Sequence, residues 1–170
     1  MIREACPGCG GSFEQSDGPV HAYMASSPAC FAAFGAVLAV EYSSPDLQAT
    51  HRLTVDTWAV QHVGDPKDRR AVQSVGLHLS RLYLQLATPR TPIETNAVML
   101  DFSRFKQTLK PLVSPGRFAM TVADIVPVIG SDAHPGVVRE WAMRTWSDWS
   151  DQHAYIRDWV VRNGRYGGGA

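Results

Sequence analysis

Three helix-start signals constrain the fold of this chain more than any other feature of its sequence. Ser27-Pro28, Ser44-Pro45 and Asp65-Pro66 each place a side-chain oxygen directly before a proline. The oxygen can cap the free N–H groups of a helix, and proline suits the first helical position. Each signal is followed by apolar residues at helical spacing. The sequence therefore predicts helices over residues 28–42, 45–63 and 66–87.

The second half of the chain is less regular. Residues 88–95 contain two prolines and are expected to form a loop. Residues 96–130 leave a short helix and an extended segment both open, and a last long helix is expected over roughly 135–162. The short links between the first three helices make them antiparallel neighbours. The sequence thus predicts an all-α fold, a helical bundle.

The amino-acid composition of the chain argues against some classes of function. The chain has 170 residues, of which 45% are hydrophobic, enough to form one domain with a substantial core. Its 16 basic and 16 acidic residues leave a net charge of zero, which argues against nucleic acid as a partner. The sequence contains no apolar run long enough for a membrane span and no export signal, so we expect a cytoplasmic protein without a membrane partner. Oligomeric state is not indicated.

The sharpest chemical motif is Cys6-Pro7-Gly8-Cys9-Gly10. Zinc prefers thiolate and imidazole ligands in a tetrahedron. Two cysteines two residues apart in a Pro/Gly turn can both point inward, where backbone N–H groups stabilise their thiolates. The motif therefore predicts a zinc cofactor and supplies half of its ligands.

Cys30, His21 and His62 are the candidates for the other two ligands. Cys6-x2-Cys9-x11-His21-x8-Cys30 would be a closed Cys3His set. If the first two helices form an antiparallel hairpin, Cys30 near the start of the first lies close to His62 at the end of the second. The fourth ligand is therefore open between His21 and His62.

Each of these residues also has a simpler interpretation. A lone CxxC motif occurs in redox dithiols, although here no strand–helix context follows it. Cys30 could be a small buried hydrophobic residue. His21 could be a loop residue that packs against Tyr23.

A second group of candidates, for catalysis, lies on the predicted second and third helices. If these helices turn back near residue 66, position 78 faces roughly position 54, between His51 and Asp56. An Asp56–His78 pair could orient an imidazole as a general base, or join His51 in a second metal site. The alternative is a buried polar network that satisfies its own hydrogen bonds between the helices.

The tryptophans of the last predicted helix fit either a core or an apolar ligand pocket with His134 or His153 at its rim. No GxGxxG, P-loop, HExxH or GxSxG pattern occurs in the sequence. Nucleotide binding and the common hydrolase classes therefore lose support.

Four segments taken together carry a family resemblance: Cys6-Pro-Gly-Cys-Gly, Asp17-Gly-Pro-Val-His21, Ser27-Pro-Ala-Cys30 and the stretch from His51 to His62. With His78 and the tryptophan-rich final helix, they resemble an uncharacterised bacterial family of small proteins that open with CPGC. The resemblance covers nearly the whole chain. It implies that the cysteines and histidines form one functional set, and it brings no assigned activity.

These observations predict three parts: a loop-rich zinc-binding segment over residues 1–27, a helical domain over 28–163 and a flexible tail over 164–170. We expect a mainly structural zinc in a module that binds a small molecule or a partner protein. The alternative is a zinc-dependent enzyme in which Asp56, His78 and His51 form an acid–base cluster. Four protein ligands would favour the first, and three ligands plus water the second.

Overall fold

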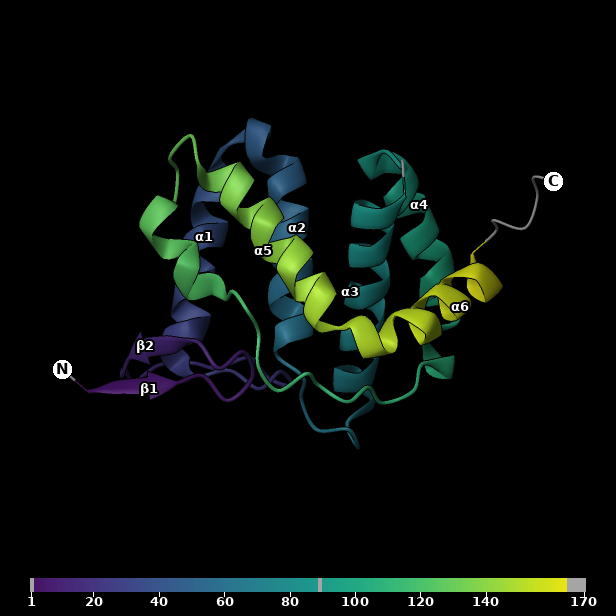
Figure 1. The fold of residues 1–170 in the computed structure, drawn as a ribbon, viewed down its shortest axis with the longest axis horizontal. Coiled ribbons are helices and arrows are strands. Elements are labelled where there is room, and N and C mark those ends of the chain that lie inside the picture. Colours follow the sequence, from purple (N-terminus) through teal and green to yellow (C-terminus); the bar gives the residue numbers. More distant parts are fainter. Residues whose placement is uncertain (1, 89, 165–170) are drawn as a thin grey trace.

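The computed structural model describes residues 2–88 and 90–164 and is built mainly of helices (Figure 1). Its longer helices are α1 Pro28–Ser43, α2 Gln48–Gln61, α3 Arg69–Ala87, α4 Pro92–Ser103, α5 His134–Asp148 and α6 His153–Asn163. Five single-turn 3-10 helices lie between them, namely η1 Pro45–Leu47, η2 Lys106–Thr108, η3 Val122–Asp124, η4 Val126–Val128 and η5 Ser150–Gln152. Two short antiparallel strands, β1 Arg3–Ala5 and β2 Ser12–Glu14, precede them. The predicted all-α fold is confirmed, with a cysteine cluster near the N-terminus.

Helices α1 to α4 alternate in direction across the molecule, and α5 crosses in front of α2 (Figure 1). Helix α2 packs against α1, α3 and α5, which makes it the centre of the fold. The strands lie beside the first turns of α1, at the opposite end of the molecule from α6 (Figure 1). The N-terminal segment therefore packs on one end of the bundle.

The buried side chains form two apolar clusters. The first lies around α1 and the N-terminal segment and includes Phe13, Phe34, Trp58 and Trp141. The second lies among α3, α4 and α6 and includes Leu79, Leu82, Phe102, Trp149 and Trp159. Helices α2 and α5 contribute to both clusters, so these two helices hold the two halves of the bundle together.

The last helix differs from the expectation of one element over 135–162. Helix α5 ends at Asp148, and η5 turns the chain before α6 begins. The turn lets Trp159 pack against Phe102 of α4, with ring centroids 5.0 Å apart. Its indole N–H also donates to the hydroxyl of Thr108, 2.9 Å away. The spacing of the tryptophans fits one straight helix, but the packing around Trp159 requires a bend.

Three helix starts also differ. Ser44-Pro45 opens the single turn η1, and α2 begins only at Gln48. The N-cap of α3 is Asp68, whose side chain accepts the N–H of Arg70, rather than Asp65. Helix α4 begins at Pro92, inside the expected loop 88–95, because Thr91 and Glu94 form a capping box.

The structure describes only part of the predicted C-terminal tail. Of the expected tail over 164–170, all but Gly164 lies outside the described residues. Within the described part of the chain, no helix combines the length and the apolar character that a membrane crossing requires.

Candidate metal centre

Cys6 and Cys9 lie in the turn that joins β1 to β2. The N–H of Cys6 donates to the carbonyl of Gly11 at 2.8 Å, and the N–H of Gly10 donates to the carbonyl of Cys6 at 2.9 Å. Gly10 has a φ of 75°, in the region that glycine adopts without strain. The N–H of Gly11 also points at the Cys9 sulfur, 3.4 Å away. The turn thus holds both thiols and offers a hydrogen bond to one of them.

Cys30 lies in the first turn of α1. Pro28 occupies the start of the helix, and the hydroxyl of Ser27 accepts the N–H of Cys30 at 3.3 Å. This position holds the thiol at the N-terminus of α1. The cap that starts α1 therefore also fixes Cys30.

His62 directly follows the last residue of α2. Its Nδ1 lies 2.6 Å from the carbonyl oxygen of Trp58. Because a carbonyl can only accept, Nδ1 carries the ring proton and Nε2 keeps a free lone pair. Nε2 lies 3.2 Å from the sulfur of Cys30. Histidines that bind metals commonly donate their other ring N–H to a carbonyl in this way.

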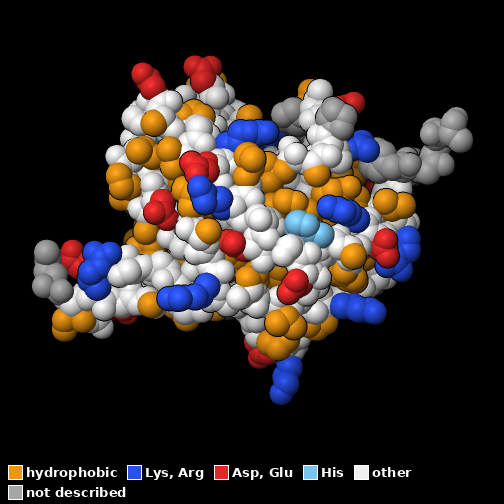
Figure 2. All heavy atoms as spheres, viewed as in Figure 1, with side chains coloured by type: hydrophobic (Ala, Val, Ile, Leu, Met, Phe, Trp, Pro, Cys, Tyr) orange, Lys and Arg blue, Asp and Glu red, His pale blue; other side chains and the backbone are white. Residues whose placement is uncertain are grey.

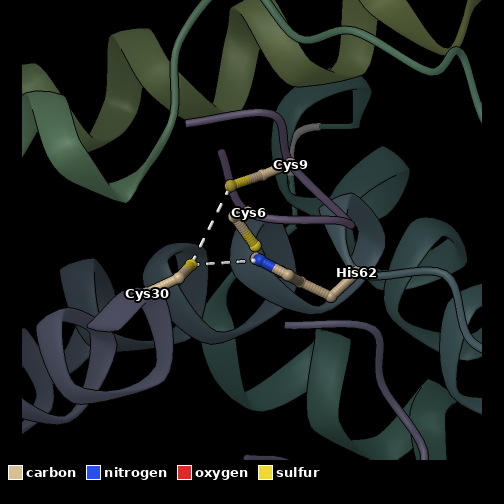
Figure 3. A group of neighbouring side chains, drawn as sticks. All are labelled: Cys6, Cys9, Cys30 and His62. Atoms are coloured by element: carbon tan, nitrogen blue, oxygen red, sulfur yellow. Dashed lines mark hydrogen bonds between the residues drawn. The ribbon is translucent and has the colours of Figure 1, made fainter. Parts of the chain in front are cut away.

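The four side chains converge on one point from three segments (Figure 3). One ligand atom from each of Cys6, Cys9, Cys30 and His62 lies within 4.8 Å of all the others. The Cys9 and Cys30 sulfurs are 3.9 Å apart, close to the roughly 3.8 Å that tetrahedral zinc with bonds of about 2.3 Å requires. All four residues are buried, with at most 2% of their surface exposed. The group can hold a metal ion.

The three thiols of this group shift one another's pKa values. Hydrogen bonds from Cys30 and Cys9 lower the pKa of Cys6. Hydrogen bonding to Cys6 and Cys9, together with burial, raises the pKa of Cys30. The pKa of Cys9 rises to about 12, because its hydrogen bond from Cys30 is outweighed by hydrogen bonding to Cys6 and by burial. A bound metal would favour the thiolate form of all three cysteines.

Gly8 shows how closely the turn packs against the helices. A β-carbon at this position would lie 2.1 Å from the carbonyl oxygen of Ala25 and 2.7 Å from Cδ2 of His62. No side chain larger than hydrogen fits there. The indole of Trp58 also stacks on the His62 imidazole at 4.0 Å between centroids. The imidazole therefore packs against both the turn and its own helix.

His21, the other candidate for the fourth ligand, lies outside the group of four. Its ring packs edge-on against Tyr23, with centroids 4.6 Å apart, and its Nδ1 accepts the N–H of Tyr23 at 3.4 Å. Partial burial and the nearby charges of His62 and His78 lower the pKa of His21. Its contacts match the simpler interpretation of a loop residue that packs against Tyr23.

A model of a family of unknown function, DUF5946, matches residues 4–150. The chain belongs to this family. The matched region contains all four residues of the cysteine–histidine group and ends before α6. No curated protein and no solved structure matches the chain. The membership agrees with the resemblance to an uncharacterised family, and it brings no activity to the chain.

Asp56, a candidate acid–base residue from the sequence, lies in a separate buried network between α2 and α3. Its carboxylate accepts hydrogen bonds from His78 Nδ1 at 2.7 Å, from Arg81 Nε at 2.7 Å and from Gln85 at 2.6 Å. Asp56 is fully buried, whereas 24% of the His78 side chain is exposed. Arg81 and Gln85 share a helical face with His78, and this spacing is the sequence signal that could have found them. The three donors saturate the carboxylate.

His51 does not join Asp56. It lies 3.3 Å from a carboxylate oxygen of Glu41, which is fully buried on α1. The other oxygen of Glu41 accepts Nε2 of His134 at 3.0 Å and the hydroxyl of Thr54. The N–H of Gly130 donates to His134 Nδ1, so the proton of this imidazole is on Nε2. His134 therefore lies in a polar network between α1 and α5, not at the rim of a tryptophan-lined pocket.

Proposed function

We propose that the chain is a zinc-binding helical domain in which the metal is mainly structural, and that the domain serves as a small-molecule-binding or interaction module. The observation that carries the metal assignment is the convergence of three thiols and one imidazole, all buried, on a single point. Soft sulfur donors with one nitrogen in a tetrahedral arrangement favour zinc over magnesium or calcium, which prefer oxygen.

Ligand count supports a structural role. Cys6, Cys9, Cys30 and His62 supply four protein ligands, which is a closed coordination shell. The residues come from the β-turn, the start of α1 and the end of α2. A metal at this point would join the turn to both helices, so its binding free energy would contribute to folding. A catalytic zinc would need an open position for water.

The direct test is metal analysis of the purified chain together with thermal denaturation before and after chelation. We expect about one zinc per chain. We also expect chelation to lower Tm by on the order of 10 °C, which corresponds to a few kcal/mol for a domain of this size. A chain that binds no zinc under reducing conditions, or that keeps its Tm after complete zinc removal, would contradict the proposal.

The Asp56–His78 contact favours one alternative, a zinc-dependent enzyme. The 2.7 Å hydrogen bond orients the imidazole, and the partly exposed ring of His78 could exchange a proton with a bound substrate. His51, the third member of the cluster, is paired with Glu41 instead. The Arg81 and Gln85 contacts give Asp56 a complete structural role without catalysis.

His78→Ala tests whether His78 takes part in the metal site. In a structural zinc domain this variant keeps one zinc per chain and any ligand binding that does not involve α3. Loss of zinc from His78→Ala would make His78 a ligand and would contradict the assignment of the four-residue group.

A further inference from the structure

A cavity of about 130 Å³ lies between α2, α3, α4 and α5, away from the cysteine–histidine group. Its volume is close to that of cavities that take up a benzene-sized molecule. Figure 2 shows basic and hydrophobic side chains gathered between the two sides of the bundle near the top of this face. The cavity therefore has the size of a small-ligand site at the junction of the two halves.

The polar lining of this cavity is basic. Arg52 of α2, Arg139 of α5 and Arg90, which directly precedes the Thr91 N-cap of α4, come from three separate segments. Gln85 and Thr95 add an amide and a hydroxyl. Among the described residues, no carboxylate lines the cavity. Three guanidinium groups on one small cavity attract anions and repel cations.

The guanidinium group of Arg52 has one nitrogen that makes no hydrogen bond. Its Nη1 is completely shielded from solvent and has no hydrogen-bond partner among the described residues. A buried donor of a charged group without an acceptor is strongly unfavourable, because it has lost its water without replacement. Asp56, on the same helix, is saturated by donors from α3. An acceptor from outside the described chain would satisfy Arg52.

We propose that this cavity binds a small molecule through a carboxylate or phosphate group, with Arg52 and Arg139 as its main contacts. Guanidinium groups match the oxygens of both anions with paired N–H donors. The apolar side chain of Leu53 on the same wall accommodates the remainder of a short ligand. The inference rests on the proposed role of the domain as a binding module, and it names the ligand class and the site.

Isothermal titration calorimetry of the zinc-loaded full chain tests the site, with inorganic phosphate and succinate as probes at constant ionic strength. We expect saturable binding of at least one probe, and the stronger one identifies the anionic group. Arg52→Gln and Arg139→Gln should each weaken binding by roughly 10-fold or more, since each removes a charge-assisted hydrogen bond. Arg139 is exposed, so its variant tests the site even if Arg52→Gln fails to fold.

Arg144→Gln is the matched control. Arg144 lies on the same helix as Arg139 but is paired with Glu140 and does not line the cavity. Its variant should bind the probe as the unaltered chain does. Absence of saturable binding for both probes, or equal weakening by Arg144→Gln, overturns the inference. Zinc content, measured in each sample, tests the metal proposal independently. Anion binding by a chain without zinc would contradict only the metal proposal. Zinc in a chain that binds neither probe would contradict only the anion site.

Discussion

Of His62 and His21, the two candidates for the fourth ligand, only His62 presents a ring nitrogen to the cysteines. Its Nε2 lies 3.2 Å from the Cys30 sulfur, whereas His21 packs on Tyr23. We expect His62→Gln to reduce zinc affinity by more than the roughly 10–100-fold that loss of a ligand's hydrogen-bond partner costs. His21→Gln should keep the affinity of the unaltered chain. Competition titration with a chromophoric chelator measures both, and a larger loss in His21→Gln would reverse the assignment.

At the scale of single residues, Cys9→Ser should lower zinc content and thermal stability together, because it removes a proposed ligand from a site whose zinc would contribute to folding. The variant changes one atom at a residue that is 1% exposed, so it causes little change in packing volume. Metal analysis and a melting curve on one sample check the coupling. A variant with full zinc content but a lower Tm would show that the sulfur acts only through packing.

The turn between β1 and β2 depends on a contact that only glycine permits. Gly8→Ala would force a β-carbon against the carbonyl of Ala25, so we expect a loss of roughly 1–3 kcal/mol, as in other overpacked sites. Gly35 on α1 is exposed, and a β-carbon there would have no neighbouring atom within 4 Å. Gly35→Ala should therefore stabilise the chain by about 0.5–1 kcal/mol. Chemical denaturation of both variants gives the two free energies, and a loss in Gly35→Ala would contradict this account.

Helices α2 and α3 are joined by the hydrogen bonds and ion pair of Asp56. Asp56→Asn leaves Arg81 without its carboxylate, and we expect a cost approaching the about 3–5 kcal/mol of a broken buried ion pair. Zinc content should not change. Glu140→Gln, which breaks an exposed pair with Arg144, is the control and should cost under about 1 kcal/mol. Equal effects in urea denaturation would remove the structural role assigned to Asp56.

The elements that sequence reasoning predicts correctly are those whose signals are local. Ser27-Pro28 caps α1 as expected, because the cap needs only the residues beside it. Thr91-Pro92 is the same kind of signal, yet the two prolines of that stretch also fit a loop, and the capping box decides between them. The bend before α6 has no local signal, since it depends on the packing of Trp159 against Phe102. The strands β1 and β2 are three residues each, too short for alternation to mark them.

Part of the candidate site can likewise be predicted from local sequence signals, and part depends on how the helices pack. The spacing of Cys6 and Cys9 indicates a metal from the sequence alone, and the pairing of α1 with α2 is what brings Cys30 beside His62. The turn predicted near residue 66 places position 78 between His51 and Asp56, and this pairing of the helices is what groups the three residues. The contact of His51 with Glu41 depends on α1, which lies on the other side of α2 from α3, so spacing within α2 cannot choose between the two neighbours.

At the scale of the whole molecule, the candidate metal centre belongs to one of the two apolar clusters. The cluster around α1 contains Cys6, Cys9 and Cys30, while the cluster among α3, α4 and α6 contains none of the four proposed ligands. The two are joined through α2 and α5. Removal of zinc should therefore loosen the molecule unevenly, at the end where the strands lie (Figure 1).

Hydrogen–deuterium exchange with mass spectrometry, before and after chelation, measures this difference segment by segment. We expect residues 2–27 and the first turn of α1 to exchange much faster without zinc, because the proposed zinc would join them to α2. Peptides from α3 and α6 should keep most of their protection, since their cluster is complete without the metal. Loss of protection throughout the chain would mean that zinc holds both clusters together. Unchanged exchange in residues 2–27 would instead mean that the packing of Gly8, Phe13 and Met24 holds the segment without a metal.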